Sequence, residues 1–461
     1  EQRQPAWWRP LRTASAMNMD FTDKRFLVID DQAMAREALR SIAQTAGAFS
    51  VEFACNYQDA IFRIRNNTPD VILCDYMLGD GRSGQQLLEE LRRFKLLPDE
   101  TIFMMVTGEQ SYEQVVSAVE LVPDDYIIKP FSPDKLLLRL ERILVKKAFF
   151  ADYYKERRKQ EFARALALLE TKLNSTAGRG YRFEIMRQKA ETLLASGHNT
   201  AAEALYRGIL DAGEFPWARA GIARTLQRQN RLDEARHEIE RVVASTPYYF
   251  DAFDVKATIC LAQGDTDEAQ QVLEQVARKT PRNYLRKRLL AEAASLNGDT
   301  ETARAVMSDV IANDNMPGAV LAEDRLALAR SHVAHDDRIA GEAALIGIRD
   351  SEVQNFSLDN QSSYAALLAI CCPERGKKKF IGLRPALMST ELAIMNRLDV
   401  LHAALYLNDA ELADRQAESM MAGPDAKSAF SAMRKLYALY GREVDFRELQ
   451  KQVALRRIHH T

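Results

Sequence analysis

Four short apolar runs near the amino-terminal end of the chain each end in a polar side chain, and this pattern restricts the fold more than any other feature. The runs start at Phe26, Val71, Ile102 and Tyr126, and they end in Asp30-Asp31, Asp75, Thr107 and Lys129-Pro130. In an open parallel sheet, ligands collect outside the carboxyl ends of the strands. We therefore expect a doubly wound α/β domain in which these polar strand ends converge on one pocket.

The residue types at the strand ends indicate phosphoryl chemistry beside a metal ion. Neighbouring carboxylates repel one another, and a hard cation such as Mg²⁺ relieves the repulsion and takes oxygen ligands, here Asp31 and Asp75. The Asp75 carboxylate can then attack a phosphoryl group, while the Lys129 ammonium neutralises charge on the transferring oxygens. The Thr107 hydroxyl can bond a phosphoryl oxygen that exists only in the modified state. A simpler interpretation is that Asp30-Asp31 and Thr107 only cap helices, but it explains one signal rather than four in register.

Residues 22 to about 146 resemble, in the order and spacing of these residues, the receiver domain of two-component response regulators. The resemblance implies a CheY-like (flavodoxin-like) sheet of five parallel strands, with Asp75 as the phosphoacceptor. It implies that Thr107 and Tyr126 form the switch and that the Lys129-Pro130 bond is cis, which is uncommon for a peptide bond. The implied Mg²⁺ ligands are Asp30, Asp31, Asp75 and the backbone carbonyl of Met77.

One position departs from the pattern of some receivers. Met77, two residues after Asp75, offers a thioether where those receivers carry an amide or acid that positions the hydrolytic water. Glu109, two residues after Thr107, can still reach the site. The lifetime of an aspartyl phosphate therefore stays open.

Length and composition predict more than one domain and a cytoplasmic protein. The chain has 461 residues, whereas one domain usually has roughly 100 to 200. A formal net charge of -2 argues against a nucleic-acid footprint over the whole protein. No run approaches the roughly 18 apolar residues of a membrane span, and the five cysteines form no disulfide framework. Residues 1–21 show no periodicity, and we expect a disordered leader or a cloning remnant.

Residues 147–182 are expected to form a helical connector. A helix starts at Pro133-Asp134, and residues 146–173 alternate charged and apolar positions without Gly or Pro. One interpretation is a single stiff helix of about forty residues, which would transmit orientation better than a flexible linker. The other is two ordinary helices with a kink near Phe150.

A period of about 34 residues marks the next part of the chain. Ala202, Ala235, Ala269 and Ala303 are separated by 33, 34 and 34 residues, and Gly or Asn stands five residues before each. Gly or Asn can close the first helix of a pair, and a small Ala lets the second helix approach its neighbour. This pattern resembles the tetratricopeptide repeat. The resemblance implies an all-α solenoid with four clear repeats over residues 183–316.

Residues 317–461 are expected to contain degenerate helix pairs of the same kind, followed by capping helices. Residues 324–348 and 399–421 read as pairs, and residues 428–440 and 446–455 read as closing helices. The stretch from Cys371 to Lys379 reads as a break and an exposed loop. Its adjacent cysteines are better interpreted as inert thiols than as a metal or redox site, because no second CxxC exists.

Together these parts predict a signalling or adaptor protein rather than an enzyme. The chain has no P-loop, zinc spacing, serine elbow or basic recognition helix. We expect Asp75 to accept a phosphoryl group from a histidine kinase or phosphotransfer protein, Tyr126 to turn inward, and the repeats to bind an unidentified protein as output. The alternatives are a phosphate sink that inhibits a kinase or regulator, a constitutive repeat scaffold, and DNA binding through residues 330–461. A homodimer also stays open.

Overall fold

The computed structural model describes eight stretches of the chain, and the chain divides into two units. The described stretches are residues 21–79, 83–93, 96–108, 123–247, 249–280, 283–312, 320–423 and 426–460. The first unit runs to Gln229 and also includes Val242–Phe250. The second unit consists of Asn230–Arg241 and Asp251–Thr461.

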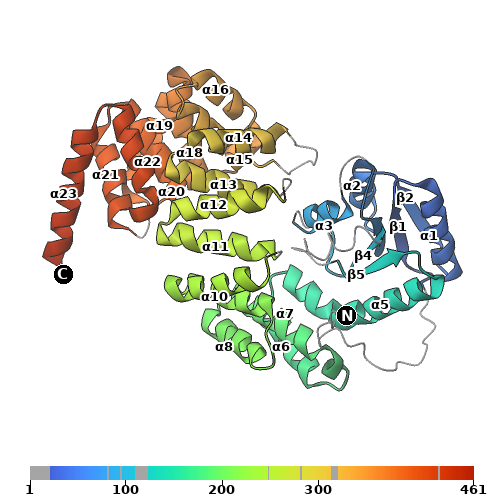
Figure 1. Ribbon diagram of the computed structural model, residues 1–461. Helices are drawn as coiled ribbons and strands as arrows, with labels where there is room; N and C mark the ends of the chain where they lie inside the picture. Colours follow the sequence, from blue (N-terminus) through green and yellow to red (C-terminus); the bar gives the residue numbers. More distant parts are fainter. Residues whose placement is uncertain are drawn as a thin grey trace. The chain divides into compact units, whose positions relative to one another are not determined.

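The first unit opens with a sheet of five parallel strands in the order β2-β1-β3-β4-β5 (Figure 1). The strands are β1 (Arg25–Ile29), β2 (Ser50–Ala54), β3 (Val71–Asp75), β4 (Ile102–Gly108) and β5 (Asp125–Lys129). Because β2 and β3 lie on opposite sides of β1, the connections reverse direction there, as in other doubly wound sheets. The predicted five-stranded α/β fold is confirmed.

Helices pack on the sheet through the apolar side chains of the strands. They are α1 (Ala33–Thr45), α2 (Tyr57–Asn66), α3 (Gly84–Arg93) and α5 (Pro133–Arg158). One core cluster joins Phe26 and Val28 of β1 to Leu39 of α1 and to Leu136 and Leu140 of α5. α1 and α5 therefore share one hydrophobic core with the sheet, and α5 continues well beyond the part that covers it.

The break after α5 corrects the prediction of one helix of about forty residues. α5 has 26 residues and ends at Arg158, and α6 covers Phe162–Asn174. Between them Gln160 has a φ of 62°, a left-handed conformation that is uncommon for a residue other than Gly. Two helices were the other interpretation, but Phe150, where that kink was expected, is fully buried inside α5. No Gly or Pro marks the true break, so the sequence carried no signal for it.

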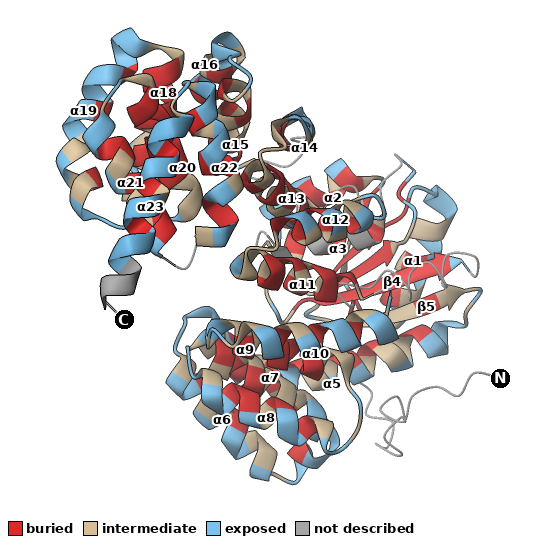
Figure 2. Cartoon of the chain, turned by 60° about the vertical axis from the view of Figure 1, so that its left-hand side comes forward, coloured by how far each residue is buried: buried red, intermediate tan, exposed pale blue. Residues whose placement is uncertain are grey.

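Helix pairs with the predicted turns follow a short 3-10 helix, η2 (Ala177–Tyr181). Their helices are α7 (Arg182–Ala195), α8 (Asn199–Leu210), α9 (Pro216–Arg228), α10 (Leu232–Ser245), α11 (Phe250–Gln263), α12 (Thr266–Ala277), α13 (Tyr284–Asn297) and α14 (Thr300–Ala312). The turn residues Gly197, Asn230, Gly264 and Gly298 all have positive φ, from 59° to 80°. The four marker alanines are all buried. Figure 2 shows that these helices combine buried and exposed residues. In the sequence period, the Gly or Asn positions therefore mark the ends of helices, and the alanine positions mark close contacts between helices.

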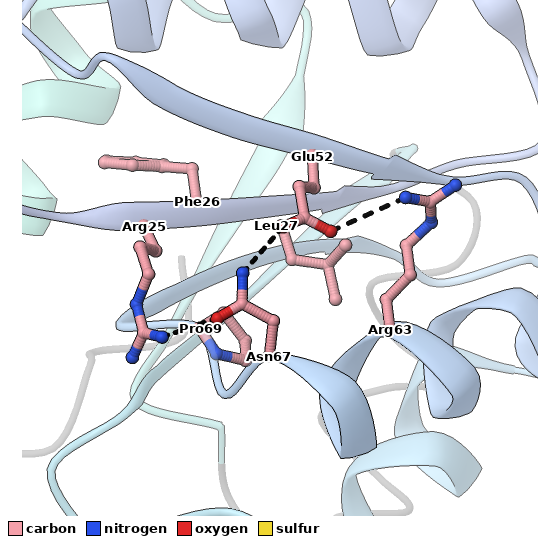
Figure 3. A pocket seen from close by; sticks show the side chains of 7 residues that line it. All are labelled: Arg25, Phe26, Leu27, Glu52, Arg63, Asn67 and Pro69. Carbon is pink, nitrogen blue, oxygen red and sulfur yellow. Dashed lines mark hydrogen bonds and ion pairs between the residues drawn. The ribbon is translucent and has the colours of Figure 1, made fainter.

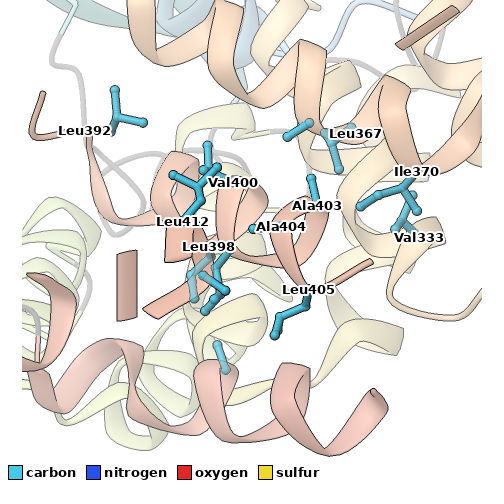
Figure 4. Close-up of a cluster of buried hydrophobic side chains, with 14 of the residues drawn as sticks. Val333, Leu367, Ile370, Leu392, Leu398, Val400, Ala403, Ala404, Leu405 and Leu412 are labelled. Carbon is cyan, nitrogen blue, oxygen red and sulfur yellow. The ribbon is translucent and has the colours of Figure 1, made fainter. Parts of the chain in front are cut away.

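The rest of the second unit is also helical. Its helices are α15 (Ala322–Val333), α16 (Arg338–Ile346), α17 (Asp350–Gln354), α18 (Leu358–Cys371), α19 (Pro373–Ser389), α20 (Ile394–Tyr406), α21 (Ala410–Ala422), α22 (Ala426–Leu439) and α23 (Glu443–His460). One apolar cluster, which includes Val333, Leu367, Ile370 and Leu405, joins these helices (Figure 4). Among the described residues, no helix combines the length and the apolar character needed to cross a bilayer.

The exposed loop expected between Cys371 and Lys379 is wrong, because this stretch starts α19. Pro373 occupies the first turn of the helix, a position where proline is favoured. Gly376 lies against α18: a Cβ there would be 2.3 Å from the carbonyl carbon of Leu368. Pro373 therefore begins a helix, and Gly376 allows two helices to pack closely. Neither residue lies in a loop.

α22 returns to helices far earlier in the second unit. Ser428 Oγ donates to the carbonyl of Leu261 at 2.8 Å, and Ser431 Oγ donates to that of Asn297 at 3.2 Å. Lys435 Nζ donates to the carbonyl of Gly298 at 2.9 Å. The expected closing helix therefore packs along the carboxyl ends of α11 and α13.

Candidate functional site

Three carboxylates gather at the carboxyl edge of the sheet. Asp30 and Asp31 follow the end of β1, and Asp75 is the last residue of the neighbouring strand β3. One oxygen from each carboxylate lies within 4.8 Å of the other two. Asp30 is buried, Asp75 is half-buried and Asp31 is exposed. The structure therefore brings the adjacent Asp30 and Asp31 together with Asp75, which lies 45 residues after Asp30 in the sequence.

Lys129 at the end of β5 is the cation of the cluster. Its Nζ donates to Asp30 Oδ2 at 2.9 Å and to Asp75 Oδ1 at 3.1 Å. Burial lowers the pKa of Lys129, but the bond to Asp30 and the charges of both acids outweigh burial, so the pKa lies above its ordinary value. The ammonium therefore stays charged. The Lys129-Pro130 peptide bond is cis, as the family resemblance implied.

The balance of charge in the cluster favours a further cation. Burial raises the pKa of Asp75, and the neighbouring Asp30 raises it further, whereas Lys129 opposes both effects. Three carboxylates meet one ammonium, so ionisation of all three leaves uncompensated negative charge. Carboxylate oxygens are also the ligands that Mg²⁺ prefers. The residues present therefore fit a hard divalent cation.

The loop after β3 passes tightly over this cluster. Gly79 has a φ of 70°, and a Cβ there would be 2.8 Å from Asp31 Oδ2. Gly therefore suits this position for both its conformation and its small size. Met77, in the same loop, pairs with Ser83 in an isolated bridge, and its side chain is 54% exposed. The role of the Met77 carbonyl as a metal ligand stays a prediction.

The two expected switch residues lie on β4 and β5. Thr107 is buried, and it follows Val106, which pairs with Asp75 across the sheet. The Thr107 hydroxyl donates to the carbonyl of Gly108 at 3.3 Å. The Tyr126 hydroxyl is buried in this structure. Glu109, which the sequence placed within reach of the site, lies outside the described residues.

Comparison with known proteins agrees with this geometry. The family model described as "Response regulator receiver domain" matches residues 26–141. The chain carries a response-regulator receiver domain. Tetratricopeptide repeats follow the receiver, because the family model described as "Tetratricopeptide repeat" matches residues 193–257 and 261–322.

Two curated relatives are each similar to about a quarter of this chain. The phosphate regulon transcriptional regulatory protein PhoB of Pseudomonas aeruginosa is 39% identical over 121 residues, which are 26% of this chain and 52% of PhoB. The response regulator MprA of a Mycobacterium species is 34% identical over 122 residues, 26% of this chain and 50% of MprA. The chain thus spans about half the length of the curated relatives it matches.

The comparison with solved structures also gave a distant match. A tetratricopeptide repeat protein from Parabacteroides merdae aligns with 55% of this chain and 96% of its own chain, at 10% identity and a TM-score of 0.39.

Arg36 is a residue of the receiver site that the sequence did not single out. Its Nη1 donates to the carbonyl of Asp30 at 2.8 Å and to that of Asp31 at 3.1 Å. An arginine in the first turns of an amphipathic helix is usually interpreted as a charged side chain that points into solvent. The spacing of five residues from Asp31 was the available signal, because it lets the side chain reach back to the loop before α1.

A small pocket lies at the opposite edge of the receiver sheet, near the start of β1 (Figure 3). Its polar side chains bond one another: Asn67 Nδ2 donates to Glu52 at 2.8 Å, and Arg25 donates to Asn67 Oδ1 at 2.6 Å. Arg63 pairs with Glu52 at 3.5 Å. These groups satisfy one another, and they lie at the other end of β1 from Asp30.

Proposed function

We propose that the protein is a phosphorylation-controlled response regulator in which Asp75 receives a phosphoryl group and the repeats bind a protein partner as output. The observation that carries this proposal is the position of the Asp75 carboxylate, half-buried at the sheet edge between two further acids and Lys129. The donor would be a histidine kinase or a phosphotransfer protein. We place this signalling role in the cytoplasm.

The residues of the receiver can perform the transfer in one step. An Asp75 carboxylate oxygen attacks phosphorus; the P–O bond forms as the P–N bond to the donor histidine breaks, and the imidazole leaves with the electron pair. Lys129 Nζ is already 3.1 Å from Asp75 Oδ1. Its positive charge can therefore stabilise the negative charge that develops on the phosphoryl oxygens. Mg²⁺ held by Asp30, Asp31, Asp75 and the Met77 carbonyl would neutralise charge on the same oxygens.

The switch would act through Thr107 and Tyr126. Among the described residues, the Thr107 hydroxyl bonds only the carbonyl oxygen of the next residue, at 3.3 Å, so a phosphoryl oxygen can compete for it. That new bond would draw the end of β4 toward Asp75. We propose that Tyr126 responds to this movement and that α5, which continues into the helical part of the first unit, carries the change onward.

The transfer is tested with the full-length protein, acetyl phosphate and Mg²⁺. Intact mass should rise by one phosphoryl group in the wild type, and Asp75→Asn should show no rise. Asp134→Asn, an exposed acid at the start of α5, is the matched control and should be modified like the wild type. Modification of Asp75→Asn to the wild-type extent would contradict the proposal.

The output is tested separately. Beryllofluoride and Mg²⁺ hold receivers in a phosphorylated-like state, so lysate of the source cells can be passed over this form and over Asp75→Ala. A protein retained by only one form supports a controlled adaptor. Identical sets would favour the constitutive scaffold, and very rapid loss of the phosphate would favour the sink.

A further inference from the structure

We propose that Arg36 is a positioning residue for the magnesium site: it fixes the loop that presents Asp30 and Asp31. This inference rests on the proposed function, because it assigns Arg36 a role toward the metal that the receiver would use. Arg36 touches the backbone of the two acids rather than the reacting atoms.

The geometry is that of a clamp across two successive peptide units. Arg36 is the fourth residue of α1 and is half-buried. One guanidinium nitrogen, Nη1, lies 2.8 Å from the carbonyl of Asp30 and 3.1 Å from that of Asp31. A guanidinium presents several N–H donors in a rigid plane, so it can hold two acceptors at a fixed separation. The loop between β1 and α1 is thereby tied to the helix that follows it.

The two acids differ in how else they are held. The Asp30 carboxylate accepts from the backbone N–H of Gln32 at 2.8 Å and from Lys129 at 2.9 Å. No donor among the described residues bonds the carboxylate of Asp31. The position of the Asp31 carboxylate therefore depends on its backbone, which Arg36 holds, and on the close approach of Gly79.

If Arg36 acts by positioning Asp31, its removal should change Mg²⁺ binding in the opposite direction from the direction expected if only its charge matters. Mg²⁺ demands near-ideal octahedral geometry, so a loosened Asp31 should weaken binding. A guanidinium beside the site repels a cation, so loss of its charge alone should strengthen binding. Arg36→Lys retains the charge but loses the planar pair of donors, which separates the two effects.

The test is calorimetric Mg²⁺ binding by full-length wild type, Arg36→Ala, Arg36→Lys and Arg40→Ala, together with thermal unfolding without metal. Arg40 is the matched control: it lies one turn further along α1, pairs with Glu37 at 3.6 Å and stacks over Phe53. We expect Arg36→Ala to weaken Mg²⁺ binding about tenfold and Arg36→Lys to weaken it several-fold. Arg40→Ala should bind within about twofold of the wild type.

A second readout separates a positioning role from a general loss of structure. Phosphorylation by acetyl phosphate should need more Mg²⁺ in Arg36→Ala, whereas the rate at saturating Mg²⁺ should match the wild type within about twofold. Unchanged or tighter Mg²⁺ binding by Arg36→Ala would overturn the inference, and so would equal weakening by Arg40→Ala. If the wild type binds Mg²⁺ no better than Asp31→Ala, the proposed magnesium site itself fails, which is a distinguishable result.

Discussion

At the scale of single residues, the positions of some receiver-site residues follow from the sequence, and the position of Arg36 does not. Asp30, Asp75, Thr107 and Lys129 could be placed from the sequence because each ends an apolar run, and parallel strands bring such ends to one edge. Arg36 could not be placed in this way. Its partners are backbone carbonyls, and nothing in the sequence shows which carbonyls a loop will turn toward a helix.

The ionisation of Asp75 gives a test without phosphate. Burial raises the pKa of Asp75 from its ordinary value of 3.8, so the folded protein holds this proton over a pH range in which the unfolded chain has lost it. The contribution of Asp75 to the free energy of unfolding therefore falls as pH rises above 3.8. Asn has no proton to lose. Without Mg²⁺, Asp75→Asn should melt at a higher temperature than the wild type at pH 7.

The same experiment at lower pH supplies the control. As the pH falls below 3.8, the Asp75 carboxyl of the wild type becomes protonated in both the folded and the unfolded state, and the difference in melting temperature should shrink. A lower melting temperature for Asp75→Asn at pH 7 would show that the bond to Lys129 outweighs burial.

At the scale of elements, α5 belongs to the receiver and also reaches the first helices of the helical part. Lys147 in its middle is buried, donates to the carbonyl of Asp99 at 2.6 Å and pairs with Asp124 at 2.9 Å. Further along, Tyr153 bonds Thr192 of α7 at 3.0 Å. The sequence showed the helical period of this stretch, but it could not show the break at Gln160, because a left-handed conformation there has no residue signal.

Substitution of Asp124 and substitution of Lys147, which form an ion pair, should lower the stability of the first unit by unequal amounts. Burial lowers the pKa of Lys147, so the fold disfavours its charge, and Asp124 is the group that compensates. Without Lys147, Asp124 still accepts from the Phe103 N–H at 2.9 Å, whereas without Asp124 a buried ammonium is left uncompensated. Asp124→Asn should therefore destabilise the first unit by about 3 to 5 kcal/mol, and Lys147→Met by clearly less.

Chemical denaturation of the full-length protein measures both variants. Lys146→Met, beside Lys147 on the same helix but half-exposed, is the matched control and should change the free energy of unfolding by less than about 0.5 kcal/mol. If Lys147→Met costs more than Asp124→Asn, the assignment of Asp124 as the compensating group is wrong.

At the scale of the whole molecule, the repeat period predicted the helix pairs but not the return of α22. Arginine–aspartate pairs link helices of the second unit that are not consecutive in the sequence: Arg286 of α13 bonds Asp254 of α11 at 2.7 Å, and Arg330 of α15 bonds Asp399 of α20 at 2.6 Å. Such contacts, like those of Ser428, join residues from 32 to 167 positions apart. Local periodicity contains no information on pairs this distant.

The turn glycines test the α22 contact. Gly197 and Gly264 occupy the same place in the repeat, and both have a φ of 80°. A Cβ at Gly264 would be 2.1 Å from Lys427 Cβ, whereas a Cβ at Gly197 would meet nothing within 4 Å. Gly197→Ala should cost about 1 kcal/mol from backbone strain alone.

Gly264→Ala should cost about 1 to 3 kcal/mol more than Gly197→Ala, because α22 must also shift. Hydrogen exchange should show faster opening of residues 426–439 in Gly264→Ala and no change there in Gly197→Ala. Equal effects of the two substitutions would mean that α22 does not pack against this turn in solution.

The central claim is that the state of Asp75 controls the helical part. Hydrogen exchange of the full-length wild type, with and without beryllofluoride and Mg²⁺, measures this directly, with Asp75→Asn as the control. We predict changed exchange at the end of β4, along α5 and in α6 and α7, and no change in Asp75→Asn. Changes confined to residues 21–132 would contradict the claim and leave a receiver that does not communicate with its repeats.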